Sequence, residues 1–137
     1  KQVLSQTPDV KLLSSDQDAK GSRDGGLNVM QGHLTRFPDI KGVFTINDPQ
    51  AIGSDLAAKQ LNRTGLTIVS VDGTRDALQA IIDGKMGATV ECNPRFGPKA
   101  FDTMERYARG EPIELWVVND DRFFDKSNAA QLIAEAY

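Results

Sequence analysis

The sequence has one cysteine, Cys92, and one histidine, His33, among its 137 residues. A single cysteine excludes an internal disulfide, and the pair is too few for a usual structural zinc site. No apolar run approaches the roughly 20 residues of a membrane-spanning helix. The chain also has no Walker A motif and no G-x-G-x-x-G fingerprint. From these absences we expect no bound metal and no cofactor.

The charge is almost balanced, with 16 Lys and Arg against 19 Asp and Glu, and the basic residues are scattered. This distribution implies no general attraction to nucleic acid. Length and composition, with 39% hydrophobic and 26% charged residues, fit one globular domain. The sequence begins at Lys1, without an initiator methionine or the apolar region of a signal peptide. We therefore expect a fragment of a longer protein.

Short apolar runs alternate with stretches whose apolar residues recur at helical spacing. The predicted strands cover residues 10–14, 42–46, 66–71, 86–92 and 113–118. The predicted helices cover residues 23–37, 49–62, 74–83, 97–109 and 127–137, and residues 119–125 form a predicted loop. This alternation predicts an α/β fold, a doubly wound parallel sheet with helices on both faces.

Three of these strands end in a small polar residue that is followed at once by a turn. Asn47 precedes Asp48-Pro49, Asp72 precedes Gly73, and Asn93 precedes Pro94. In an open α/β sheet, ligands bind in the crevice beyond the carboxyl ends of the parallel strands. The pattern therefore predicts a site for a small polar ligand at this edge.

Several short motifs occur together in a specific order and spacing. They are GLNVM (26–30), FPDI (37–40), VFTIND (43–48), AIG (51–53), VDGT (71–74) and GATV (87–90) before Asn93-Pro94. In these motifs the segment from about residue 16 to 98 resembles the type I periplasmic sugar-binding proteins, the ribose- and galactose-type solute receptors of ABC importers. The ligand domains of the lactose-repressor group share the same core.

The resemblance implies two lobes joined by three crossing segments, with the ligand between them. Residues 1–92 would be the C-terminal lobe, lacking its first strand, which is normally a central one. Residues 93–118 would be a helix and a strand that belong to the N-terminal lobe, and residues 119–137 a crossing segment and closing helix. Because buried backbone groups need partners, we expect a missing N-terminal lobe polypeptide or a swapped copy to complete the sheet.

By resemblance, Asn47 and Asp72 match the family's sugar-binding asparagine and aspartate. An amide both donates and accepts hydrogen bonds, and a carboxylate accepts strongly from hydroxyl groups. The structural alternative for Asn47 is an Asx turn before Pro49. For Asp72 it is a turn residue before Gly73, or a cap on the helix that begins near Thr74.

Cys92 occupies the position where the family often carries a sugar-contacting glutamine. A thiol bonds weakly, so Glu91 or Asn93 could take that role, and Cys92 is favoured as a small buried hydrophobe. Arg23 lies where the family places a contact over the sugar. It could bond a hydroxyl or be a solvated residue in the first turn of a helix.

We expect a sugar receptor of the periplasm, not an enzyme, that binds a monosaccharide or sugar alcohol and delivers it to the membrane subunits of an ABC permease. One alternative is the effector-binding domain of a lactose-repressor-type transcription regulator. Another is a flavodoxin-like enzyme using Asp72 or Asp48, or a phospho-acceptor domain. Asp16 and Asp18 could mimic the acidic pair of such a domain, but no clear lysine follows a late strand.

Overall fold

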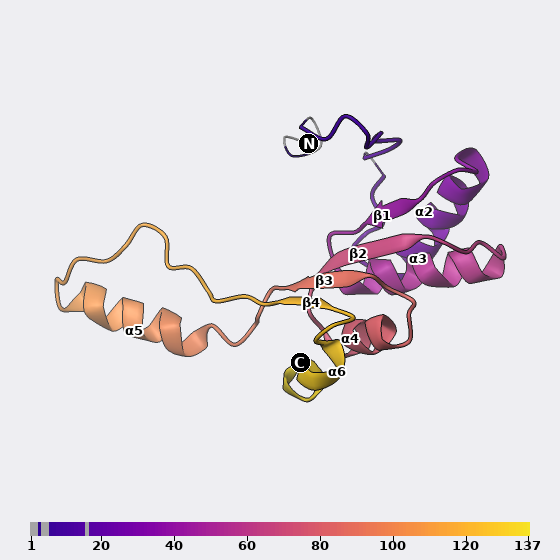
Figure 1. Cartoon of the computed structure of the whole chain (residues 1–137). Helices are drawn as coiled ribbons and strands as arrows, with labels where there is room; N and C mark the ends of the chain where they lie inside the picture. Colours follow the sequence, from indigo (N-terminus) through magenta and orange to yellow (C-terminus); the bar gives the residue numbers. More distant parts are fainter. Residues whose placement is uncertain (1–2, 4–5, 16) are drawn as a thin grey trace.

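Four strands form one sheet in the order β1-β2-β3-β4 in the computed structural model, which describes residues 3, 6–15 and 17–137 (Figure 1). The strands are β1 (Gly42–Phe44), β2 (Thr67–Asp72), β3 (Ala88–Glu91) and β4 (Phe123–Asp125). The first three are parallel, and β4 runs antiparallel to β3. The prediction of an α/β fold with a mainly parallel sheet is confirmed.

Four of the five predicted helices form within two residues of their expected limits. They are α2 (Arg23–Arg36), α3 (Asp48–Gln60), α4 (Arg75–Ile82) and α5 (Gly97–Ala108). The expected helix over 127–137 is instead a short α6 (Ala129–Leu132) followed by the 3₁₀ turn η1 (Ile133–Glu135). Ser127 does not cap it, because its hydroxyl and amide both donate to the carboxylate of Asp125.

Two predicted strands, over residues 10–14 and 113–118, are wrong: the structure has irregular backbone in both segments. A strand is stable only when a neighbouring strand satisfies its backbone groups, and none of the described strands lies beside either segment. The predicted loop over 119–125 is also partly wrong. Its end forms β4, where Phe123 pairs with Val90 and Phe124 with Thr89.

Four of the described helices cover one face of the sheet. Figure 1 shows α2, α3, α4 and α6 on the same side, where Ile68 and Phe124 join the main core. Side chains alternate between faces, so the register places Phe44, Val90 and Phe123 on the opposite face. Phe44 is 67% exposed and Phe123 56%. The described residues thus provide one of the two helical layers of a doubly wound sheet.

Helices α2 and α3 approach each other closely at two glycines. A Cβ atom on Gly53 would lie 2.0 Å from the carbonyl oxygen of Arg23, and one on Gly26 would lie 2.4 Å from that of Gln50. Only glycine permits this backbone contact. The contact holds the start of α2 against the start of α3, at the carboxyl edge of β1.

Residues 92–121 leave the sheet after β3 and return to it at β4, carrying α5 away from the rest of the structure (Figure 1). No residue of α5 is buried. Its apolar side chains Phe101, Met104 and Tyr107 are exposed, and so is Trp116 on the returning segment, at 81%. The helix therefore has an apolar face without a partner among the described residues.

Candidate ligand-binding site

The carboxyl ends of β1, β2 and β3 meet at one edge and bring together most of the predicted site residues. The backbone amide of Asp48 donates to Oδ2 of Asp72 at 3.2 Å, joining the end of β1 to the end of β2. The amide of Cys92 donates to the carbonyl oxygen of Asp72 at 2.8 Å, joining β2 to β3. Asp72 is therefore at the centre of this edge.

Asn47 is the N-cap of α3, and both polar atoms of its side chain have partners. Oδ1 accepts from the amide of Gln50 at 3.0 Å, and Nδ2 donates to the carbonyl oxygen of Gly21 at 2.9 Å. The cap satisfies one of the free amides at the start of the helix. The second bond fixes the amide group beside the loop that precedes α2, so its orientation at the edge is defined.

Asp72 has an unusual backbone conformation for a residue with a side chain. Its φ is 131°, and Gly73 follows with a φ of 80°. Non-glycine residues are strained in this region and are found most often at functional sites. Its carboxylate does not cap α4, since Thr74 does so. Partial burial, and then the negative charge of Asp48, raise the pKa of Asp72 despite the hydrogen bond from the Asp48 amide.

Beneath this edge lies the carboxylate of Asp48, which is completely buried. Oδ1 accepts from the hydroxyls of Ser70 and Thr89, the latter at 2.7 Å. Oδ2 accepts from the amide of Thr74 at 2.7 Å and from its hydroxyl at 2.8 Å. Asp48 thus links three strand ends.

Glu91 uses both carboxylate oxygens in an ion pair with Arg122. Nε and Nη2 of Arg122 each lie 2.9 Å from one oxygen of Glu91. The Arg122 guanidinium lowers the pKa of Glu91, against the opposing effect of burial. The Glu91 side chain is buried and its acceptors are occupied, so the geometry gives it a role in joining β3 to the start of β4.

Cys92 is exposed, so the prediction of a small buried hydrophobe is wrong. It follows the last residue of β3, where the chain leaves the sheet. Asn93 comes next: its amide donates to Asp121, and its Oδ1 accepts from the amide of Arg95 at 2.8 Å. Asn93 also lines a shallow hollow of about 210 Å³ with Arg95, Phe96 and residues 119–121.

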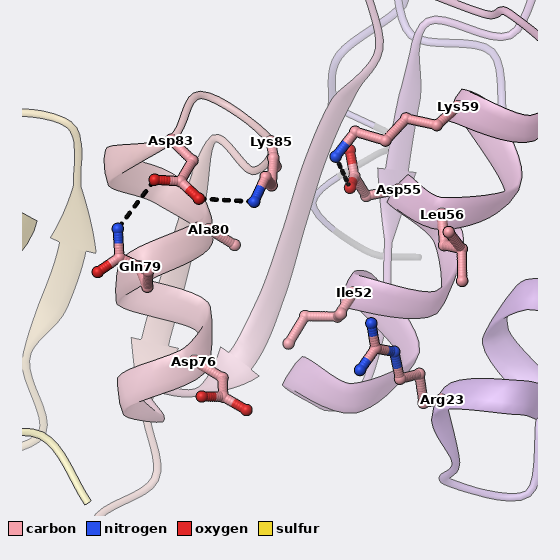
Figure 2. Close-up of a pocket in the computed structure, with 10 residues that line it drawn as sticks. All are labelled: Arg23, Ile52, Asp55, Leu56, Lys59, Asp76, Gln79, Ala80, Asp83 and Lys85. Carbon is pink, nitrogen blue, oxygen red and sulfur yellow. Dashed lines mark hydrogen bonds and ion pairs between the residues drawn. The ribbon is translucent and has the colours of Figure 1, made fainter.

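Arg23 lies apart from the other candidates. It is the first residue of α2 and lines a groove of about 260 Å³ between α3 and α4. Figure 2 shows its guanidinium beside Ile52, in the same groove as Asp76. Two ion pairs, Lys59 with Asp55 and Lys85 with Asp83, occupy the other end of this groove (Figure 2).

The groups that the edge presents are hydrogen-bond donors and acceptors. Among the described residues, no three His, Cys, Asp or Glu side chains are grouped so that they could hold a metal ion.

None of the helices in the described part of the chain is long and apolar enough to cross a membrane. Asp16, one of the acids that could mimic a phospho-acceptor pair, lies outside the described residues.

Two residues at this edge, Tyr137 and Arg122, had no predicted role there, and Asp48 had one only in the alternative of a flavodoxin-like enzyme. Asp48 follows a strand end directly, a position that could have identified it as a structural acceptor. Tyr137 places its hydroxyl 2.8 Å from the carbonyl oxygen of Asp72 and 3.1 Å from that of Cys92. Arg122 binds Glu91 across 31 residues of sequence. No local pattern connects Tyr137 or Arg122 to the edge.

Comparisons with known proteins identify the family of the chain. A family model described as "Periplasmic binding protein domain" matches residues 1–112. The ribose import binding protein of Escherichia coli is 37% identical over 101 residues, covering 73% of this chain and 34% of that protein. The fructose import binding protein of Bifidobacterium longum is 31% identical over 130 residues, covering 90% of this chain and 38% of that protein.

A solved structure gives the same result for the fold. The periplasmic binding protein of the arabinose ABC transporter of Shewanella, bound to L-arabinofuranose, matches with a TM-score of 0.86 and 31% identity, over 98% of this chain and 46% of that one. The chain spans less than half the length of each of these relatives. Sequence and structure together show that the chain belongs to the periplasmic binding protein family, among its type I sugar-binding members.

Proposed function

We propose that this chain forms one side of a sugar-binding cleft, in which Asp72 and Asn47 bond the hydroxyl groups of a monosaccharide or sugar alcohol. The observation that carries the proposal is the strained, half-buried Asp72 at the shared edge of three strands. A carboxylate fixed in this way is suited to accept from two neighbouring hydroxyls. Exposed Cys92 and half-buried Asn93 lie next to it, on the chain that leaves β3.

The relatives extend the proposal to transport. Those named above carry ribose import, fructose import and arabinose ABC transporter in their names. We infer an extracytoplasmic receptor that releases its sugar to an ABC permease and carries out no chemical reaction. These names favour a role in import over a role as the effector domain of a transcription regulator. Such effector domains share the core, but no feature of the site favours them.

The lobe arrangement is part of the same proposal. Residues 1–92 belong to one lobe, 93–118 pack in the other, and 119–137 cross back. The exposed apolar face of α5 supports this arrangement, because such a face is stable when another surface covers it.

The fluorescence of Trp116 tests whether the second lobe covers this region. Iodide should quench the fluorescence strongly in this chain and weakly once the second lobe is present. Equal quenching in both forms would contradict the arrangement.

Sugar binding is best tested by nuclear magnetic resonance titration, which detects weak complexes. In an edge open to water hydrogen bonds contribute little net affinity, so we expect dissociation constants on the order of millimolar for this chain alone. D-ribose, D-fructose and L-arabinose are added in turn to the ¹⁵N-labelled chain. At least one should shift the amides of residues 72–74 saturably, and the amide of Met30 in α2 should stay unchanged.

Two matched variants sharpen the titration. Asp72→Asn should abolish the saturable shifts, because it removes the carboxylate while keeping its shape. Asp76→Asn changes an exposed acid only four residues away, in the first turn of α4, and should leave them intact. Absence of a saturable shift with every sugar, or equal loss in both variants, would contradict the proposed role of Asp72.

A further inference from the structure

The strained backbone of Asp72 is held from two sides. On one side, the amide of Asp48 binds its carboxylate. On the other, the hydroxyl of Tyr137 shares its proton between the carbonyl oxygens of Asp72 and Cys92, at 2.8 and 3.1 Å. A conformation this rare persists only where its surroundings over-determine it. These contacts act together with the Cys92 amide, which also donates to the carbonyl oxygen of Asp72.

Tyr137 is well placed for this task. The amide of Arg75, in the first turn of α4, donates to the carbonyl oxygen of Tyr137 at 2.9 Å, which fixes the backbone of Tyr137 over the β2–α4 turn. Burial, and then the charges of Asp72 and Asp48, raise the pKa of Tyr137 to about 12. The phenol therefore stays protonated and donating at neutral pH.

Asp48 fixes the same turn from below. Its carboxylate binds both the amide and the hydroxyl of Thr74, two residues after Asp72. Thr89 supports it from the next strand, accepting from the amide of Gly73 at 3.3 Å while it donates to Asp48. All acceptor positions of Asp48 face donors of this turn or of the strands beneath it, so none is directed at a ligand.

We propose that Tyr137 and Asp48 are positioning residues that hold Asp72 in the conformation in which its carboxylate faces the ligand. Neither residue needs to contact the sugar. The consequence for binding rests on the proposed function, whereas the conformational part applies to the chain without ligand. The two parts can therefore be tested separately.

The first test removes one hydroxyl. Tyr137→Phe should speed hydrogen exchange of the Cys92 amide, which binds the carbonyl oxygen of Asp72, by about 5-fold, the loss of one ordinary hydrogen bond. Exchange at Met30 in α2 should not change. Tyr107→Phe, at the other tyrosine of the chain, exposed on α5, is the matched control and should leave Cys92 unaffected. Unchanged exchange at Cys92 in Tyr137→Phe, or equal acceleration at Met30, would overturn the inference.

The second test concerns the carboxylate directly. Asp48→Asn removes a negative charge and an acceptor beneath the turn, so the pKa of Asp72, followed by carboxyl ¹³C shifts, should fall towards its ordinary value. Asp55→Asn changes a half-buried acid of the same helix that pairs with Lys59, and it should leave that pKa unchanged. An unchanged pKa of Asp72 in a folded Asp48→Asn chain contradicts the role of Asp48. If that variant does not fold, Tyr137→Phe alone decides.

The link to binding uses D-ribose, D-fructose and L-arabinose again. Tyr137→Phe should weaken the binding of a sugar that shifts residues 72–74 by about 3- to 10-fold, and Tyr107→Phe should not. If the unmodified chain binds none of the three sugars while Cys92 exchange responds as expected, the proposed function fails and the positioning of Asp72 stands. If sugar binds but Tyr137→Phe leaves both readouts unchanged, the positioning inference fails.

Discussion

Arg122 binds both carboxylate oxygens of Glu91, with Nε and Nη2 each 2.9 Å from its partner, and also donates its backbone amide to Oε2 at 3.1 Å. The pair joins the last residue of β3 to the residue before β4. Arg122 also lies over the ring of Phe124, 5.1 Å from its centre, and bonds Glu135. It therefore secures the point at which the chain re-enters the sheet.

Removing the charge of Glu91 should destabilise the fold. We expect Glu91→Gln to lower the free energy of unfolding by about 1.5–3 kcal/mol, because hydrogen bonds to charged groups are stronger than neutral ones. Glu111→Gln is the control, since Glu111 pairs with Arg109 and Arg106 on the surface and should cost less than about 1 kcal/mol. Chemical denaturation measures both, and equal losses would contradict the assignment.

The same pair predicts a dependence on pH. The pKa of Glu91 is lower in the folded chain than in the unfolded one. Its stabilising effect is therefore complete above the unfolded pKa, about 4.3, and is lost as the pH falls through the lower folded value. The difference in unfolding free energy between the unmodified chain and Glu91→Gln should shrink between pH 7 and pH 3. A difference that stays constant would disprove the linkage.

The close contact of α2 and α3 predicts opposite effects for two glycines. Gly53→Ala places a methyl group against the backbone of Arg23 and should cost about 1–3 kcal/mol, because the helices must move apart. Gly32→Ala meets no atom within 4 Å in the middle of α2, and should stabilise the fold by roughly 0.5–1 kcal/mol. Thermal unfolding of the two variants compares them, and a shift of the same sign in both would contradict the packing.

Neighbouring phenylalanines of β4 should respond differently to substitution. Phe123 points to the open face and Phe124 is completely buried in the core. Phe123→Thr should reduce binding of an apolar dye such as ANS with less than about 0.5 kcal/mol change in stability. Phe124→Ala should cost about 3–5 kcal/mol. Unchanged dye binding in Phe123→Thr would mean that the open face is not the dye's site.

The sequence was sufficient for the helices because their signals are local. The apolar spacing of α2 and the Asn47-Asp48-Pro49 start of α3 act over a few residues and predict these helices within two residues of their limits. Segments 10–14 and 113–118 have strand-like sequences too, but a strand also needs a neighbour, which local pattern does not reveal. In the same way β4 was predicted as a loop, because its pairing with β3 depends on distant residues.

The site was predictable to the same extent. Asn47, Asp72 and Asn93 could be placed at one edge because the carboxyl ends of parallel strands meet there. The sequence did not reveal which residues bind the carboxylate of Glu91 and the backbone of Asp72. Arg122 and Tyr137 reach the edge from 31 and 65 residues away. Contacts between residues so far apart in the sequence leave no local motif and no hydrophobic periodicity from which they could be predicted.

The excursion that carries α5 begins after β3 and ends at β4, two strands that lie side by side. The chain therefore leaves the sheet and returns to it at neighbouring positions, which the Glu91–Arg122 ion pair joins. The ladder hydrogen bonds of the sheet come from the four strands, and residues 93–121 contribute none of them. A different direction of α5 would therefore leave the paired strands unchanged, together with the position of Asp72 at their edge.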